Sequence, residues 1–94
     1  MGFQFSWDPA KAAANLRRHR VSFEEAATAF ADPWSITVPD PDHSRAEDRF
    51  ILIGRSQRER LLVVIHVERG LHELRLISAR PATRSERLTY EDHP

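Results

Sequence analysis

The spacing of apolar and polar residues predicts a short strand followed directly by a helix. Phe3, Phe5 and Trp7 alternate with polar neighbours, which is the two-residue period of a strand with one buried face. Asp8 suits the capping position of a helix, and Pro9 suits its first turn, where a missing N–H costs nothing. The chain therefore begins with the pattern of a strand and then a helix.

A second helix is predicted by a start signal and a stop signal. Ser22 and Glu25 have the spacing of a capping box, in which each side chain bonds the backbone of the other residue. Asp32 and Pro33 end the pattern, because proline cannot continue a helix. We expect a second helix between these signals.

Four runs of strand-forming residues follow the two helices. The connections between the last three runs are short, so neighbouring runs are expected to pair as antiparallel hairpins. The third run is apolar on both faces, which predicts a central strand with packing on each side. The runs cover residues 34–38, 49–54, 60–67 and 72–79.

A third helix is predicted at the end of the sequence, and we expect one domain over residues 1–94. Thr83 and Glu86 have capping-box spacing at the start of this helix. The order of elements predicts an α+β fold: a short N-terminal strand, two helices, a four-stranded antiparallel meander and a C-terminal helix.

Composition excludes several classes of protein. The 94 residues contain no cysteine, so neither a disulfide framework nor a thiolate zinc site is available. No apolar run approaches the roughly 20 residues that a membrane span needs, and the first residues lack the pattern of a secretory signal. We expect a cytoplasmic protein that does not bind membranes.

The net charge of zero conceals an uneven distribution. Residues 1–48 carry five basic and eight acidic groups, whereas residues 49–94 carry nine basic and six acidic groups. Of the 14 basic residues 13 are Arg, whose planar guanidinium grips phosphate or carboxylate in two places. Skewed codon usage is the alternative explanation of the arginine bias. A basic second half still suits a polyanionic partner.

The last predicted strand and the last helix carry the first set of candidate site residues. Alternation places Arg75 on one face of its strand with Ile77 and Ala79, while Leu74, Leu76 and Ser78 occupy the other face. Converging guanidinium groups would hold a backbone phosphate and stabilise a pentacovalent transition state. Solvated surface charges, paired with nearby glutamates, are the alternative. The candidate cations are Arg75, Arg80, Arg84 and Arg87.

A second cluster, His43, Glu47 and Arg49, lies on the loop that enters the second strand of the meander. An imidazole, a carboxylate and a guanidinium supply the acid, base and electrostatic parts of phosphodiester transesterification. Attack by a ribose 2′-hydroxyl needs no metal and restricts the reaction to RNA. A mobile acidic loop without chemistry is the alternative.

Other polar groups give weaker signals. His66 and His72 flank a predicted hairpin and are expected to be structural, although they could join Asp40, Asp42 and His43 as metal ligands. No tight metal motif supports that reading, so we expect neither a metal nor a cofactor. The basic end of the first helix, residues 17–20, is a candidate auxiliary contact for nucleic acid or an acidic partner.

Several motifs are spread over most of the chain. They are Trp7-Asp8-Pro9-x-Lys11-x-x-x-Asn15-x-x-x-His19-x-Val21-Ser22-Phe23-Glu24-Glu25-Ala26, Phe30-x-Asp32, Asp42-His43-x-x-x-Glu47-x-Arg49-Phe50 and Arg75-Leu76-Ile77-Ser78-Ala79-Arg80-x-Ala82-Thr83-x-x-Glu86-Arg87-x-x-Tyr90. Together these motifs resemble the BrnT family of type II toxins, and the match runs in register from about residue 3 to residue 91.

The resemblance implies a RelE-like ribonuclease fold and an endoribonuclease of the mRNA interferase type that arrests growth. It further implies neutralisation by a BrnA-like antitoxin of ribbon-helix-helix type in a hetero-oligomer, which would reach operator DNA only through the antitoxin. The alternative is a non-catalytic relative that binds the antitoxin and represses the operon.

The polar motif members carried over from the family are Lys11, His43, Glu47, Arg49, Arg75, Ser78, Arg80 and Tyr90. Arg75 and Arg80 are expected to stabilise transition-state charge, and either Glu47 or His43 to move protons. Lys11, Arg49, Arg84 and Arg87 are expected to position RNA. This chain has Arg20 where the family usually has glycine, so a left-handed helix cap there would cost on the order of 1 kcal/mol.

Overall fold

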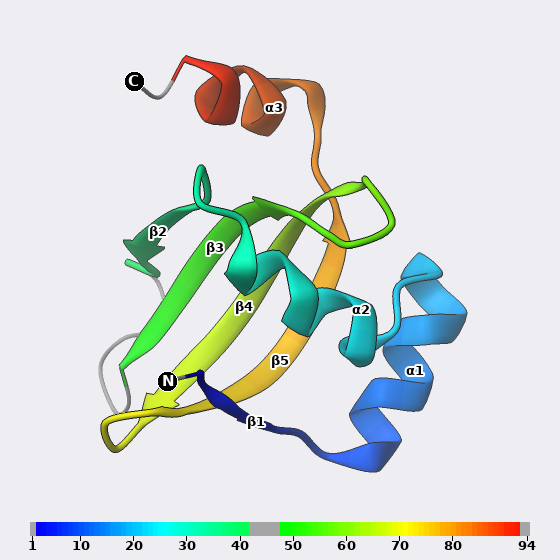
Figure 1. Ribbon diagram of the computed structural model, residues 1–94. Helices are drawn as coiled ribbons and strands as arrows, with labels where there is room; N and C mark the ends of the chain where they lie inside the picture. The colour runs from blue at the N-terminus through cyan, green and yellow to red at the C-terminus, as the bar shows by residue number, and fades with distance from the viewer. Residues whose placement is uncertain (1, 42–47, 93–94) are drawn as a thin grey trace.

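The computed structural model describes residues 2–41 and 48–92 as one five-stranded sheet with helices (Figure 1). The sheet has the strand order β1-β5-β4-β3-β2. In chain order the elements are β1 (Gln4–Ser6), α1 (Pro9–His19), α2 (Phe23–Thr28), the short 3₁₀ helix η1 (Ala29–Ala31), β2 (Ile36–Pro39), β3 (Arg49–Arg55), β4 (Leu61–Arg69), β5 (Glu73–Pro81) and α3 (Arg84–Glu91).

The predicted α+β class and the antiparallel meander are confirmed, but the sheet is mixed. Strands β2 to β5 pair with their sequence neighbours in antiparallel fashion. Strand β1 adds to the outer edge of β5 in parallel, where Gln4 to Ser6 pair with Glu73 to Arg75. The sheet therefore has five strands, because the N-terminal strand joins it instead of standing apart.

Local capping signals define the helix starts as predicted. Asp8 accepts a hydrogen bond from the Ala10 amide at 2.9 Å and caps α1. At the start of α3, Thr83 and Glu86 form both bonds of a capping box. Only half of the predicted box forms at α2: the Ser22 hydroxyl accepts from the Glu25 amide, but the Glu25 carboxylate points to more distant partners.

Helices α1 and α2 cover one face of the sheet and enclose the main core (Figure 1). Strand β4 lies at the centre, as its two apolar faces predicted. The core consists of Val21, Phe23, Ala26, Ala29, Leu52, Leu62, Val64, Leu76 and Ala79. Gly54 allows η1 to approach the sheet, because a Cβ at this position would lie 2.8 Å from the Ala29 carbonyl oxygen.

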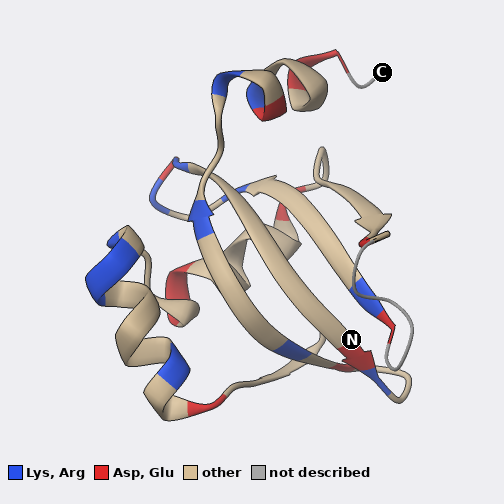
Figure 2. Ribbon diagram, turned by 180° about the vertical axis from the view of Figure 1, so that it is seen from behind, with Lys and Arg blue, Asp and Glu red and all other residues tan. Residues whose placement is uncertain are grey.

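Helix α3 is attached near one end of the sheet and has no buried residue. Its Tyr90 packs at the edge of a second, smaller cluster formed by Ile53, Leu61 and Val63 on the face away from the core. Seen from behind, the middle of this face carries no helix (Figure 2). Among the helices of the described residues, none is long and apolar enough to cross a membrane.

A β-bulge in β5 corrects the predicted alternation of that strand. Ile65 pairs with Ser78 and His66 pairs with Leu76, so Ile77 is an extra residue without an opposite partner on β4. The bulge returns Ala79 to the core, where it is fully buried. The prediction that Ala79 shares a face with Arg75 is therefore wrong, because one inserted residue reverses the alternation beyond it.

Candidate functional site

Strand register brings two of the candidate cations together on the face of the sheet opposite the core. Val67 of β4 pairs with Arg49 of β3 on one side and with Arg75 of β5 on the other. Paired residues point to the same face, and neighbouring strands lie about 4.8 Å apart, so the two arginines lie roughly 10 Å apart across Val67. We call this surface the open face.

The bulge adds Ser78 and Arg80 to the open face. Ser78 pairs with Ile65, and Arg80 pairs with Val63, two residues further along β4. Arg75 and Arg80 are therefore separated by four residues of β4, which is about 13 Å along the strand. In Figure 2 the blue segments of β3 and β5 mark the basic positions around this face.

Arg75 is available for a ligand, whereas Arg80 is already engaged. Within the part of the chain that the structure describes, no hydrogen bond or ion pair holds the half-buried Arg75 guanidinium. Arg80 donates from both terminal nitrogens to the two carboxylate oxygens of Glu86, each at 2.7 Å. This hydrogen bond from Arg80 is the main cause that lowers the pKa of Glu86 to about 2. The pair fastens α3 to β5.

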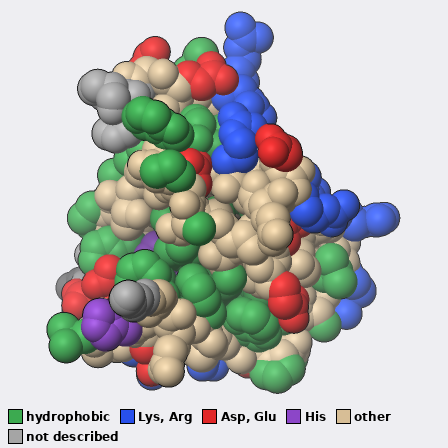
Figure 3. All heavy atoms as spheres, viewed as in Figure 1, with side chains coloured by type: hydrophobic (Ala, Val, Ile, Leu, Met, Phe, Trp, Pro, Cys, Tyr) green, Lys and Arg blue, Asp and Glu red, His purple; other side chains and the backbone are tan. Residues whose placement is uncertain are grey.

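Two further predicted site residues, Arg84 and Arg87, lie elsewhere. Arg84 and Arg87 are exposed on α3, beyond the Arg80–Glu86 pair, and do not join Arg75 on the sheet. The predicted proton-transfer residues His43 and Glu47 lie outside the described residues. Figure 3 shows that Lys and Arg side chains gather along the side of the molecule that carries α1 and at the base of α3.

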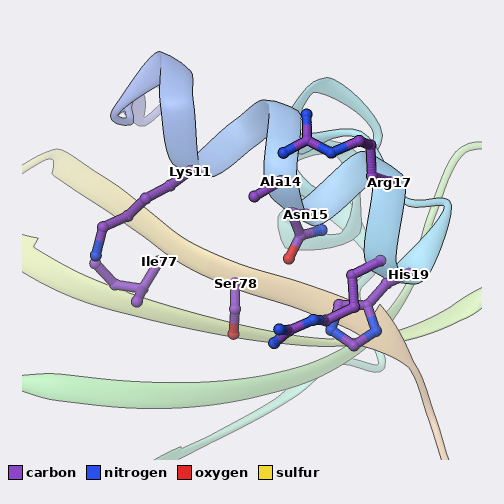
Figure 4. A pocket seen from close by; sticks show the side chains of 8 residues that line it. Lys11, Ala14, Asn15, Arg17, His19, Ile77 and Ser78 are labelled. Carbon is purple, nitrogen blue, oxygen red and sulfur yellow. The ribbon is translucent and has the colours of Figure 1, made fainter.

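Lys11 lines an open groove of about 580 Å³ between α1 and the edge of β5. Its labelled side chain lies at one end of the groove and that of His19 lies at the other, with Ile77 and Ser78 between them (Figure 4). The remaining lining residues are Ala14, Asn15, Arg17 and Arg18. Three residues of the basic helix end therefore face the same space as Lys11.

Asn15 forms the floor of this groove, and its structural importance was not predicted. Its amide nitrogen donates to the carbonyl oxygens of Val21 at 2.9 Å and Ala79 at 2.8 Å. Its amide oxygen accepts from the Ala79 N–H at 3.1 Å. The side chain thus pairs with the edge of β5 as a strand would. An asparagine in a helix interior, where it weakens the helix, was the available signal.

Two further polar clusters join distant elements and also escaped prediction. The buried Glu25 binds Ser56 and Arg60 in the turn between β3 and β4, and the hydrogen bond from Arg60 is the main cause of its lowered pKa. Asp32 accepts from the Tyr90 hydroxyl at 2.7 Å and from the Arg55 amide at 2.8 Å. Burial raises the pKa of Tyr90, and Asp32 adds to this effect. These contacts hold the fold together around the site.

The histidines give no metal site in the described structure. His66 is 1% exposed in the core, between the rings of Phe30 and Phe50, as its structural assignment predicted. Among residues 2–41 and 48–92, no three His, Cys, Asp or Glu side chains gather closely enough to hold a metal ion. Asp42 and His43, two of the alternative ligands, lie outside these ranges.

Comparison with known proteins agrees with this architecture. Residues 7–86 match the family model described as the ribonuclease toxin BrnT of type II toxin–antitoxin systems. The crystal structure of the Brucella abortus ribonuclease toxin BrnT is similar, with a TM-score of 0.68 and 23% sequence identity over 87% of this chain and 99% of that chain. No match was found among curated protein sequences. The chain belongs to the BrnT family of ribonuclease toxins of type II toxin–antitoxin systems.

Proposed function

We propose that this protein is a metal-independent endoribonuclease of the mRNA interferase type, whose open face holds the scissile phosphate. The observation that carries the proposal is the placement of Arg75 and Arg49 on either side of Val67, with the Arg75 guanidinium unpaired among the described residues. Guanidinium groups in a fixed frame stabilise negative charge that develops on phosphate oxygens. Family membership supports RNA as the substrate.

In the proposed reaction the ribose 2′-oxygen attacks the adjacent phosphorus and the bond to the 5′-oxygen breaks. Glu47 or His43 accepts the proton of the 2′-hydroxyl, and the other group protonates the departing 5′-oxygen. The products are a 2′,3′-cyclic phosphate and a 5′-hydroxyl, so no water or metal takes part in the cleavage. Arg75, with Arg80, neutralises the pentacovalent intermediate, while Arg49, Arg84 and Arg87 position the strand.

The proposed partner is a BrnA-like antitoxin of ribbon-helix-helix type. An acidic or apolar segment of the antitoxin would complement the cationic open face and exclude RNA by occupying it. The resulting hetero-oligomer would contact operator DNA only through the antitoxin. In the cytoplasm, the free toxin would arrest growth by cleaving RNA.

The direct test is incubation of the purified protein with RNA in excess chelator. Wild-type protein is expected to cleave the RNA, and Arg75→Ala is expected to lower the rate at least about tenfold through lost transition-state stabilisation. Arg58→Ala is the matched control, because its side chain is 73% exposed in the turn between β3 and β4. Intact RNA at micromolar wild-type protein would overturn the proposal.

One observation favours the alternative, a non-catalytic relative that binds an antitoxin and represses the operon. Both terminal nitrogens of Arg80 are already occupied by Glu86. This alternative predicts that expression without the antitoxin leaves growth unaffected while the complex still forms.

A further inference from the structure

We infer that the groove between α1 and β5 binds the phosphate backbone of single-stranded RNA and leads it around the sheet edge to the open face. This inference rests on the proposed function and adds a substrate track outside the reacting centre. The groove is lined by Lys11, Arg17, Arg18 and His19 from α1, together with Ile77 and Ser78 from β5.

The groove exists because β5 is covered by a strand over only part of its length. Strand β1 pairs with Glu73 to Arg75 and ends at Ser6. Beyond this point α1 takes over the edge, where Asn15 binds Ala79. Between the two attachments, Ile77 and Ser78 of β5 and the small Ala14 of α1 line the groove.

The charged residues that line the groove are all basic. No acidic residue lines the groove. Lys11, Arg17 and Arg18 are exposed, and within residues 2–41 and 48–92 none of them is held by a carboxylate. A groove lined by unpaired cations attracts the one ligand feature that every nucleic acid shares, its backbone phosphates.

The position of Lys11 points to a ligand rather than to helix stability. Arg17 and Arg18 lie in the last turn of α1, where the helix dipole favours cations in any case. Lys11 lies in the first turn, two residues after Pro9, where the dipole disfavours a cation; the Asp8 carboxylate at this end caps the Ala10 amide, and within the described residues no ion pair joins it to Lys11. The chain's one lysine is thus placed against local helix electrostatics, toward the groove.

The bulge connects the groove to the open face. Ser78 lines the groove and also pairs with Ile65, in the row of residues between Arg75 and Arg80 on the open face. A strand of RNA lying in the groove therefore passes the β5 edge at Ser78 and arrives beside Arg75. Because phosphates are the groups contacted, the groove contributes affinity without sequence preference.

The test measures binding of a 2′-O-methyl RNA of mixed sequence, which lacks the attacking hydroxyl and is not cleaved. Lys11→Ala is expected to weaken binding about fivefold at low salt and to reduce the slope of log Kd against log salt by about 0.7. The weakening is expected to be equal for different sequences. Lys11→Arg should retain wild-type affinity, and the exposed control Arg58→Ala should change Kd less than about twofold.

The outcomes separate this inference from the proposed function. If wild-type protein leaves unmodified RNA intact, the proposed function fails whatever the binding result. If wild-type protein cleaves RNA but Lys11→Ala binds as tightly as Arg58→Ala, the groove inference is overturned. It is also overturned if Lys11→Ala weakens only the complex with an antitoxin. Support requires a raised KM with an unchanged kcat for Lys11→Ala on cleavable RNA, alongside the weaker binding.

Discussion

The two faces of the sheet are stabilised in different ways. The face under α1 and α2 is closed by apolar side chains, and its buried polar groups Asn15 and Glu25 have hydrogen-bond partners from distant elements. On the open face, α3 buries no residue and is attached through the Arg80–Glu86 pair and the Tyr90–Asp32 hydrogen bond. Stability therefore depends mainly on one face, and on the other face the Arg75 guanidinium has no hydrogen bond or ion pair among the described residues, so it can contact a ligand.

Substitution of Asn15 should have the largest effect on stability. Asn15→Ala removes three buried hydrogen bonds and leaves the N–H and C=O of Ala79 and the C=O of Val21 without partners. We expect a loss of about 3 kcal/mol in the free energy of unfolding, measured by urea denaturation. Leu16→Ala, at a neighbouring and half-exposed position, is the control. Equal losses for the two variants would contradict the closed-face account.

Acidification should weaken the closed face through His66. Burial lowers the pKa of His66, an effect that a hydrogen bond with the Val64 backbone only partly opposes. Because the folded pKa lies below the unfolded value near 6.5, the unfolded chain binds more protons between the two values. The free energy of unfolding should therefore fall as pH drops below about 6.5, by up to about 1.4 kcal/mol per pH unit.

His66→Leu is the variant that isolates this effect in urea titrations at several pH values. It should flatten the dependence between pH 6.5 and 5, where the carboxylates Glu25, Asp32 and Glu86, whose pKa values are lowered, are still ionised. The same slope in wild type and variant would show that another group is responsible.

Relief of backbone strain at the end of α1 should stabilise the protein, by less than the Asn15 substitution destabilises it. Arg20 adopts φ 59° and ψ 32°, the left-handed cap in which a side chain is unfavourable. The left-handed helix cap therefore forms in this chain, although arginine stands where the family usually has glycine. Arg20→Gly should raise the free energy of unfolding by up to about 1 kcal/mol in urea denaturation, relative to Arg20→Ala, which keeps the Cβ. Equal free energies of unfolding for the two variants would show that the Cβ at position 20 causes no strain.

Local signals explain which parts of the fold could be predicted. The caps at Asp8, Ser22 and Thr83 depend on residues two or three positions away, so spacing alone reveals them. The parallel addition of β1 and the contacts of Glu25 depend on residues more than 30 positions away. Periodicity contains no information about such pairings, and these are the features that were missed.

The site was predictable as a set of residue types but not as an arrangement. The sequence identifies Arg49, Arg75 and Arg80 as candidates, yet only the register through Val67 and Val63 places them on one face. The bulge at Ile77 places Ser78 and Arg80 on the face of Arg75, where the alternation predicted Ile77 and Ala79. Nothing in the alternation of β5 signals an inserted residue. Arg84 and Arg87 share a helix as expected, but tertiary packing sets that helix apart from Arg75.

Arg80 lies on the open face and also attaches α3, and its pairing with Glu86 gives the prediction with the smallest effect. Glu86→Gln removes the charge that pairs with Arg80 and should cost about 0.5–1 kcal/mol in urea denaturation, since both side chains are partly exposed. If Arg80 contacts RNA, Glu86→Gln should retain or raise the cleavage rate, while Arg80→Ala lowers it at least about tenfold. If Arg80 only attaches α3 to β5, both variants should lose activity equally. That result would make Arg80 a structural residue and leave Arg75 as the residue that contacts the phosphate on the open face.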